Sequence, residues 1–326
     1  MRVLVTGATG FVGRHLVRLL SSLKYRTYGT YFLKDSAVGV SGVKLFRCDI
    51  RKLAQLKALM REVCPSRVYH LAAQSSPAHS LTHLQDVYHT NFWGTYNVLE
   101  AVRQITPKAR VLVVGSGQCY GSAKPTDLPV TECHAFAPPN PYALSKAAAD
   151  MLAGQYYSMF GLHIVRARPF NHTGPGQGPG FVCSNFARQI AAIELGYRRP
   201  VLCVGDLRAQ LDFTDVRDVV RAYELLLEKA NSGEAYNVAS ARVAPLKQIV
   251  KVLVSFCSRP IRVSVERKRF RPGDVRTISG SNRKLRAATG WKPAYNIRQT
   301  LEDLYAWWKT NLSDGLTRST FFESRR

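Results

Sequence analysis

Short runs of apolar residues alternate with longer stretches of helical spacing along most of this chain. The run Val3-Leu4-Val5 is typical of a strand that is buried on both faces. The segment from His15 to Leu20 follows it with apolar residues at helical spacing. Repeated alternation of this kind predicts an α/β fold, in which a parallel sheet carries helices on both faces.

A glycine-rich turn joins the first predicted strand to the first predicted helix. It reads Thr6-Gly7-Ala8-Thr9-Gly10-Phe11-Val12-Gly13, with the spacing G-x-x-G-x-x-G. Glycine lets the backbone approach a pyrophosphate closely, and the start of the helix attracts its negative charge. The motif therefore predicts a doubly wound, Rossmann-type sheet that binds a dinucleotide, against the alternative of an ordinary strand-to-helix turn. The residues predicted to contact this cofactor are Gly7, Thr9, Gly10, Phe11, Val12 and Gly13.

The segment Asn140-Pro141-Tyr142-Ala143-Leu144-Ser145-Lys146 holds a second candidate for chemistry. Pro141 suits the first turn of a helix, where its missing N–H would have no partner anyway. Tyr142 and Lys146 then share one helix face. An ammonium beside a phenol favours the phenolate, so we expect a lowered Tyr142 pKa and proton exchange near neutral pH. Taken alone, the pair is also consistent with a solvated lysine near a buried tyrosine.

These two motifs resemble those of the extended short-chain dehydrogenase/reductase superfamily, and further segments match in order along the chain. The resemblance implies that Ser116, Tyr142 and Lys146 are catalytic. It implies that Lys146 also binds the nicotinamide ribose, and that Asn91 helps a proton relay from the dimer-forming helix. The further residues expected at the cofactor are Asp49, Ile50, Leu71, Ala72, Ala73 and Asn91, together with Tyr142 and Lys146.

The second half of the chain resembles the nucleotide-sugar branch of this superfamily, the NAD-dependent epimerase/dehydratase family. The segments 168–177 and Arg271-Pro272-Gly273-Asp274 are most similar to those of GDP-4-keto-6-deoxy-D-mannose reductases. The resemblance implies a GDP-sugar substrate, whose C4 ketone NAD(P)H reduces to GDP-D-rhamnose or its C4 epimer. The expected substrate contacts are Ser75, Ser116, Gln118, Asn171, Val182, Arg271 and Asp274. No metal site is expected.

The order of these motifs predicts two domains. Cofactor motifs fill the first half, so residues 1–170 and 210–240 are expected to form the NAD(P)-binding domain. Residues 171–209 and 241–315 are expected to form a smaller α/β domain that binds the nucleotide sugar. By resemblance, helices beginning near residues 86 and 142 pair with a second subunit in a homodimer.

Two departures from the family pattern bear on the reaction. Dehydratases of this family carry a glutamate two residues after the catalytic Ser or Thr, where this chain has Gln118. An amide cannot shuttle a proton near pH 7, so the sequence favours reduction over dehydration. Leu211 stands where relatives usually place an arginine that meets the diphosphate. Either a neighbour such as Arg208 compensates, or the nucleotide lies differently.

Two other functions stay open at this point. The nearest is a 4,6-dehydratase or 4-epimerase that recycles its coenzyme. A non-catalytic protein that senses the coenzyme is the other, and the intact catalytic residues argue against it.

One missing acidic residue bears on the choice between NADPH and NADH. The segment 27–34 has no acid for a ribose 2′-hydroxyl, and only Asp35 lies beyond it. Lys34 or Arg14 is available for a 2′-phosphate, which favours NADPH over NADH.

The net charge of +24 raises nucleic acid or an anionic membrane surface as partners. No nucleic-acid motif accompanies it, and the densest basic run, 267–271, overlaps the segment expected to bind GDP. No apolar stretch approaches the ~20 residues that span a bilayer. Seven scattered cysteines without a C-x-x-C pair predict reduced thiols in a cytoplasm. We therefore expect a cytoplasmic protein with neither a nucleic-acid partner nor an integral membrane segment.

Overall fold

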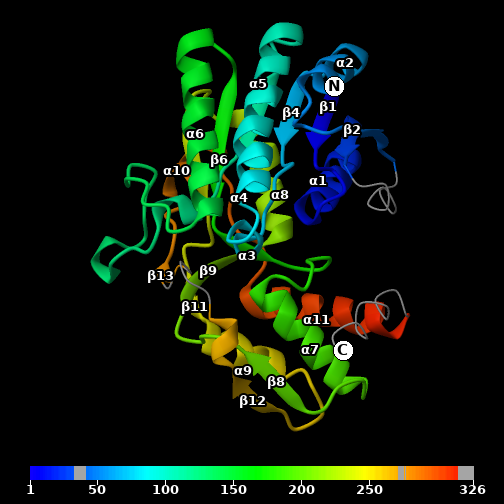
Figure 1. Cartoon of the computed structure of the whole chain (residues 1–326), viewed down its shortest axis with the longest axis vertical. Helices are drawn as coiled ribbons and strands as arrows, with labels where there is room; N and C mark the ends of the chain where they lie inside the picture. Colours follow the sequence, from blue (N-terminus) through cyan, green and yellow to red (C-terminus); the bar gives the residue numbers. More distant parts are fainter. Residues whose placement is uncertain (33–41, 271–274, 276, 315–326) are drawn as a thin grey trace.

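Seven parallel strands form the large sheet of the computed structural model, which describes residues 1–32, 42–270, 275 and 277–314 (Figure 1). The order is β10-β6-β5-β4-β1-β2-β3, and every neighbouring pair is parallel. This order confirms the doubly wound, Rossmann-type sheet that the sequence predicts. The strands are β1 (Arg2–Thr6), β2 (Arg26–Tyr31), β3 (Lys44–Arg47), β4 (Arg67–His70), β5 (Arg110–Val114), β6 (Ile164–Pro169) and β10 (Ala235–Val238).

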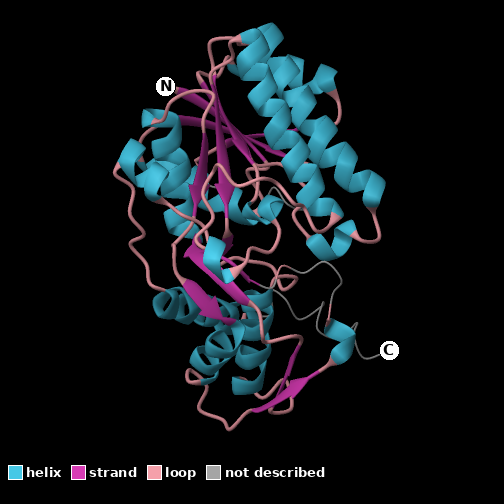
Figure 2. Ribbon diagram, turned by 90° about the vertical axis from the view of Figure 1, so that its left-hand side faces the viewer, coloured by secondary structure: helices cyan, strands magenta, loops and turns pink. Residues whose placement is uncertain are grey.

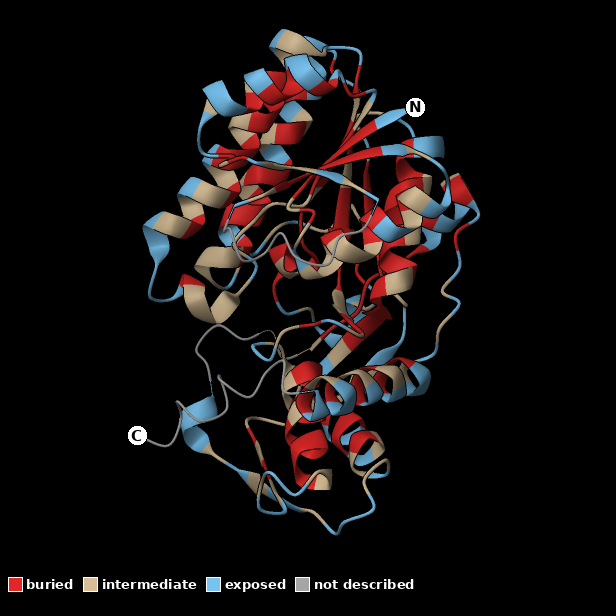
Figure 3. Ribbon diagram, turned by 90° about the vertical axis from the view of Figure 1, so that its right-hand side faces the viewer, coloured by how far each residue is buried: buried red, intermediate tan, exposed pale blue. Residues whose placement is uncertain are grey.

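Helices cover both faces of this sheet because successive side chains of each strand point to opposite sides (Figures 2 and 3). In β1, Val3 and Val5 pack with helices α1 and α8, whereas Leu4 packs with α2, α5 and α6. All three side chains are fully buried, which explains the unbroken apolar run in the sequence. The helices are α1 (Phe11–Ser22), α2 (Leu53–Val63), α5 (Gly94–Ile105), α6 (Pro141–Phe160) and α8 (Val216–Lys229).

A smaller unit of helices and short strands lies below the large sheet in Figure 1. Its core joins Ile190, Leu253 and Leu304 from three different helices. A two-stranded parallel sheet of β8 and β12 completes it. The elements are α7 (Val182–Glu194), α9 (Leu246–Val254), α11 (Ile297–Ser313), β8 (Val201–Val204) and β12 (Arg262–Val265).

A third sheet connects the two units. Its central strand β9 (Gln210–Asp215) pairs with β7 (Asn171–Thr173), β11 (Val243–Pro245) and β13 (Thr277–Ile278). The chain then returns to the large sheet through α8 and β10, and α10 (Arg283–Thr289) packs against α8. Trp291 is buried in the same core as α1 and α8. The two-domain division stays a prediction. Two elements lie differently from it: β9, predicted in the cofactor domain, belongs to the connecting sheet, and α10, predicted in the substrate domain, packs against α8.

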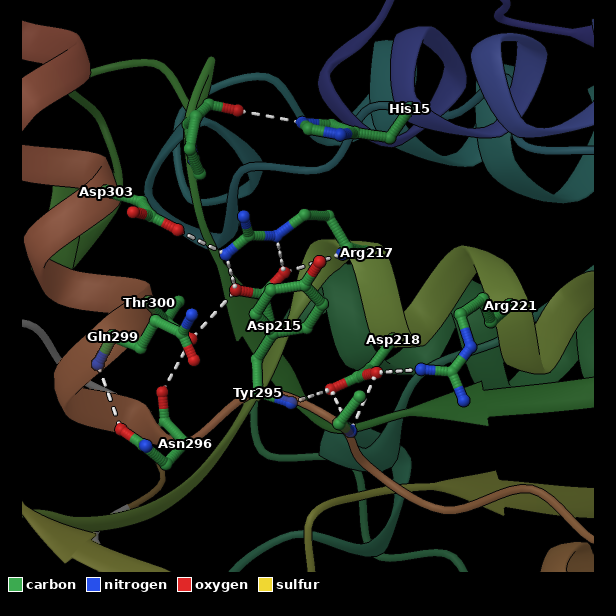
Figure 4. Close-up of polar contacts among 12 residues, drawn as sticks. His15, Asp215, Arg217, Asp218, Arg221, Tyr295, Asn296, Gln299, Thr300 and Asp303 are labelled. Carbon is green, nitrogen blue, oxygen red and sulfur yellow. Dashed lines mark hydrogen bonds and ion pairs between the residues drawn. The ribbon is translucent and has the colours of Figure 1, made fainter. Parts of the chain in front are cut away.

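The start of α8 is bound tightly to the last part of the chain (Figure 4). The Arg217 guanidinium lies 2.7 Å from Asp215 Oδ2 and 2.7 Å from Asp303 Oδ2, and its centre is 3.7 Å from the ring centre of Tyr295. Asp218 accepts hydrogen bonds from the backbone N–H groups of Ala294 and Tyr295. These charge-assisted bonds fix α11 relative to the large sheet.

No helix in the described part of the chain combines the length and the apolar character that crossing a membrane requires.

Candidate active site

The carboxyl ends of the parallel strands meet at one edge of the large sheet, which is where ligands bind in folds of this type. A cleft of about 1500 Å³ lies there, and residues of the smaller unit form its other wall. Most of the residues predicted from the sequence line it. They are Gly7, Thr9, Gly10, Phe11, Val12, Gly13, Asp49, Ile50, Leu71, Ala72, Ala73, Ser75, Ser116, Gln118, Tyr142, Asn171 and Val182.

The glycine turn leaves the start of α1 open toward this cleft. Gly7 has φ +69°, and a Cβ atom there would lie 2.9 Å from the backbone of Ala72, so only glycine fits. Gly10 caps α1 without a side-chain hydrogen bond, and the first turn of the helix carries no acidic residue. The backbone N–H groups of that turn therefore form a positive, uncrowded surface that suits the pyrophosphate of a dinucleotide.

Asn91 holds the neighbouring wall of the cleft in place. It lies in the π-helical turn η2 (His89–Trp93), between α4 (Leu84–Tyr88) and α5, and it is buried. Its Oδ1 accepts the N–H of Gln74 at 2.8 Å, and its Nδ2 donates to the carbonyl of Gln74 at 3.0 Å and to Ser145 Oγ at 2.9 Å. Asn91 thus ties the turn that carries Leu71–Ser75 to helix α6. It does not itself line the cleft.

Helix α6 starts as the sequence predicts. The side chain of Asn140 accepts the backbone N–H of Ala143 at 2.9 Å, and Pro141 occupies the first turn. The cap directs Tyr142 into the cleft, while Lys146, one turn later, is buried behind the cleft wall. The two side chains thus share a helix face, but only the tyrosine borders the open space.

Ser116 meets Tyr142 from the end of β5. It caps the short 3-10 helix η3 (Gly117–Tyr120), where its Oγ accepts the N–H of Gln118 at 3.1 Å. The Ser116 side chain also lies close enough to the Tyr142 phenol to lower its pKa, and both residues line the cleft. Two hydroxyl groups, from a strand end and from a helix start, therefore converge on one point of the cleft.

The predicted lowering of the Tyr142 pKa is wrong. Burial raises the pKa of Tyr142 to about 12, and the nearby Ser116 side chain opposes the shift only in part. Burial also lowers the pKa of Lys146 to about 8, although the nearby Cys119 and Asp150 favour its charge. Desolvation thus outweighs the tyrosine–lysine attraction that the four-residue spacing suggests.

Cys119 packs beside these groups as a structural residue. It is fully buried, and burial raises its pKa to about 12, so the thiol is protonated.

Gln118, Asn171 and Val182, which the sequence assigns to the substrate, all line this cleft. Leu211 also lines the cleft, as part of an apolar surface from β9. Arg208, named as a possible substitute for an arginine at 211, instead forms an ion pair with Asp206 at 2.7 Å and is largely exposed. Arg271 and Asp274 lie outside the described residues, as do Lys34 and Asp35.

Several cleft residues escaped the sequence analysis. Lys268 and Arg269, from η5 (Arg267–Arg269), and Arg51, beside Asp49, are the cations that line the described cleft. The basic run around 267 was the available signal for the first two. Arg14 was considered for a 2′-phosphate, but its Nε donates to the carbonyl of Thr9 and it faces a separate, smaller cavity. Among the described residues, no cluster of His, Cys, Asp and Glu could hold a metal ion.

The strand order, the glycine turn and the Ser116–Tyr142 pair together define a Rossmann-type oxidoreductase of the short-chain dehydrogenase/reductase class. The sequence model of the GDP-mannose 4,6 dehydratase family matches residues 4–304, and the chain belongs to this family. It is 33% identical to the GDP-6-deoxy-D-mannose reductase of Pseudomonas aeruginosa, over 96% of this chain and 99% of that protein. It is 29% identical to GDP-mannose 4,6 dehydratase 2 of Arabidopsis thaliana, over 92% of this chain and 84% of that protein.

Solved structures agree with this assignment. RMD from Pseudomonas aeruginosa complexed with NADPH superposes with a TM-score of 0.81 at 32% identity, covering 95% of this chain and 100% of that one. The Thermus thermophilus UDP-glucose 4-epimerase in complex with NAD gives a TM-score of 0.84 at 27% identity, covering 95% of this chain and 99% of that one.

The buried ammonium of Lys146 predicts a pH-dependent stability. In an unfolded chain the ordinary lysine pKa is 10.5, and in the fold it is about 8. Between these values the unfolded chain binds more protons, so the stability of the wild type rises with pH, and below pH 8 the penalty is complete. We expect Lys146→Met to increase the free energy of unfolding more at pH 7 than at pH 10, and the difference between the two effects should be about 2.5 kcal/mol.

Urea unfolding of the wild type and of Lys146→Met at both pH values measures the effect of the substitution. The readout is how much that effect changes between pH 7 and pH 10, and not the size of the effect at either pH. Lys44→Met is the matched control, because the Lys44 side chain is 63% exposed in a surface ion pair with Glu62. A Lys146→Met effect that does not change with pH would contradict the buried ammonium.

Proposed function

We propose that this protein uses NADPH or NADH to reduce the C4 ketone of GDP-4-keto-6-deoxy-D-mannose. The product is GDP-D-rhamnose or its C4 epimer. One observation carries the proposal: Ser116 and Tyr142 converge in the cleft, and the neighbouring position that would need a carboxylate for dehydration is Gln118. The similarity to a GDP-6-deoxy-D-mannose reductase over nearly the whole chain supports the same reaction.

Tyr142 is the proton donor in this proposal. Its pKa of about 12 keeps the phenol protonated at neutral pH, so it can give its proton to the alkoxide that develops as the ketone is reduced. Ser116 donates a hydrogen bond to the same oxygen and stabilises its charge. When bound, the coenzyme supplies the hydride for the ketone carbon.

Lys146 and Asn91 support these two groups. Lys146 lies one turn behind Tyr142 on α6. By its match to the family motif it would bind the nicotinamide ribose, and its positive charge would stabilise the phenolate that remains after Tyr142 has given up its proton. Asn91 positions both α6 and the Leu71–Ser75 turn through its three hydrogen bonds. A part for Asn91 in a proton relay requires that solvent reach these hydrogen bonds with Gln74 and Ser145.

The GDP-sugar is assigned to the part of the cleft that Asn171, Val182, Gln118 and Ser75 line. Lys268 and Arg269 supply positive charge for the diphosphate beside Leu211, which cannot bind it. Arg271 and Asp274 complete the site by their match to the family motif.

The nearest alternative is a 4,6-dehydratase or a 4-epimerase, because relatives with these names share the fold. Both return the coenzyme to its starting redox state. Dehydration also needs a base for the C5 proton, which Gln118 does not provide.

We further propose a cytoplasmic homodimer. Apolar side chains stand exposed on the outer faces of η2 and α6, including Trp93 at 51%, Leu144 at 47% and Met151 at 66%. Leu144 and Met151 lie two helical turns apart on one face of α6. A second copy of the chain would cover such a surface, which is costly to leave in water.

Tyr142→Phe should lower turnover by about 10²–10⁴-fold, the usual contribution of a positioned acid, while NADPH affinity stays nearly unchanged. Tyr157→Phe, on the exposed face of the same helix, is the matched control and should keep full activity. Steady-state kinetics with the 4-keto sugar and fluorescence titration with NADPH measure the two effects. A Tyr142→Phe enzyme with most of the wild-type rate would show that another group donates the proton.

The reaction type is tested with GDP-mannose and with the 4-keto sugar in deuterium oxide. A reductase oxidises NAD(P)H stoichiometrically and leaves C5 unlabelled beyond background exchange, whereas a dehydratase exchanges C5 on every turnover. We expect no 4-keto-6-deoxy sugar from GDP-mannose, and little from Gln118→Glu, because a new base does not supply the rest of a dehydratase site. Formation of that sugar without added reductant would overturn the reductase proposal.

The dimer proposal predicts that Met151→Glu weakens self-association by at least about tenfold, since a carboxylate buried in an apolar contact costs more than 1.4 kcal/mol. Sedimentation velocity over a concentration series measures the effect. Val265→Glu is the control, because Val265 is an exposed apolar residue on β12, away from these helices. A wild-type monomer at micromolar concentration would refute the proposal.

A further inference from the structure

Two contacts join the glycine turn to the strand that carries Asn171. The ring of Phe11, at the start of α1, stacks on His172 of β7 with ring centres 6.2 Å apart and planes at 7°. His15, one turn further along α1, places Nε2 2.8 Å from the carbonyl oxygen of Pro175 (Figure 4). A carbonyl only accepts, so Nε2 of His15 carries the hydrogen and donates it.

The charges around His15 keep this donor neutral. Burial lowers its pKa most, the Pro175 carbonyl and Asp215 oppose that shift, and Arg18 and Arg217 add to it. A neutral imidazole with hydrogen on Nε2 donates one directed hydrogen bond across the boundary between α1 and the 174–177 turn.

The turn that His15 contacts also packs closely against α8. Gly174 has φ +153°, and a Cβ atom there would lie 2.8 Å from Cγ1 of Val216 at the start of α8. Only glycine fits this approach, so the turn is pressed against α8 on one side and against His15 on the other.

Gln177 connects this turn to β7 and to the start of α7. Its buried side chain accepts the Thr173 hydroxyl at 2.6 Å and donates to the carbonyl of His172 at 2.9 Å. The hydroxyl of Ser184, on α7, donates to the Gln177 carbonyl. A displacement at Pro175 therefore reaches both β7 and the start of α7, the elements that present Asn171 and Val182 to the cleft.

We propose that His15 is a positioning residue that couples coenzyme binding to nucleotide-sugar binding. The proposal rests on the proposed function, because it takes the glycine turn as the coenzyme site and the β7–α7 wall as the nucleotide-sugar site. Phe11 and His172 line the cleft, whereas His15 does not. A ligand on either side orders the shared contact, so the second ligand loses less freedom and binds more tightly. By linkage the effect is the same in both directions.

The test measures NADPH binding to the full chain with and without GDP, by fluorescence titration. In the wild type, saturating GDP should tighten NADPH binding at least about fivefold. In His15→Ala this factor should fall to below about twofold, while the affinity for NADPH alone changes by less than about threefold. In turnover, the KM for the nucleotide sugar should rise while kcat stays close to the wild-type value.

Two variants separate positioning from general loosening of the fold. His15→Gln keeps a side-chain N–H for the Pro175 carbonyl and should retain most of the coupling. Asp303→Asn removes the Arg217–Asp303 ion pair, which joins the same two regions at a different place, and should leave the coupling intact. The melting temperature of each variant is measured beside the titrations. If His15→Ala does not fold, His15→Leu replaces it, because leucine fills much of the space of the ring but has no N–H for the Pro175 carbonyl.

The outcomes distinguish this inference from the proposed function. If the wild type binds neither NADPH nor GDP, the proposed function fails. If it binds both without mutual effect, or if His15→Ala keeps the wild-type coupling, the positioning role is refuted. Equal loss of coupling in His15→Ala and Asp303→Asn would also refute it, because any loosening between the regions would then suffice.

Discussion

The parallel hydrogen bonding of β1 with β4, and of β4 with β5, is the constraint on which the rest of this structure depends. It aligns Thr6 with His70 and His70 with Val113, so three strands end together at one edge of the sheet. The glycine turn, the Leu71–Ser75 turn and the Ser116 segment follow these ends directly. Residues more than a hundred positions apart in the chain are thereby brought to a single cleft.

Burial sets the chemistry of that cleft more strongly than neighbouring charge does. The fold buries His70 and Lys146 and partly covers Tyr142, and in each case desolvation is the largest cause of the shifted pKa. His70 is held between the hydroxyls of Thr6 and Thr95 with its pKa lowered to about 3, so it stays neutral. A phenol that is protonated at neutral pH and an ammonium with a pKa of about 8 suit the proposed reaction. In it Tyr142 gives a proton to the reduced ketone, and the Tyr142–Lys146 pair is protonated again afterwards.

The two halves of the cleft are joined by directed polar contacts as well as by apolar packing. Arg217 binds Asp215 and Asp303 at the outer side of α8, and His15 binds the Pro175 carbonyl nearer the cleft. The first contact holds α11 in place, and the second lies directly behind the glycine turn. Their different positions explain why we assign stability to one and coupling between ligands to the other.

Local patterns in the sequence determined the sheet class, the first strand and helix, the start of α6 at Pro141, and the glycine turn that lines part of the cleft. These features depend on short-range rules: buried strands are apolar throughout, glycine permits positive φ, and proline suits a helix start. Only the tertiary structure decided the pKa of Tyr142, because desolvation depends on which distant segments cover the side chain. It also decided that Asn91 lies behind the cleft wall, that Arg208 is bound to Asp206, and that Lys268 and Arg269 line the cleft. Each of these outcomes rests on contacts between segments far apart in the chain, whose distances no local spacing encodes.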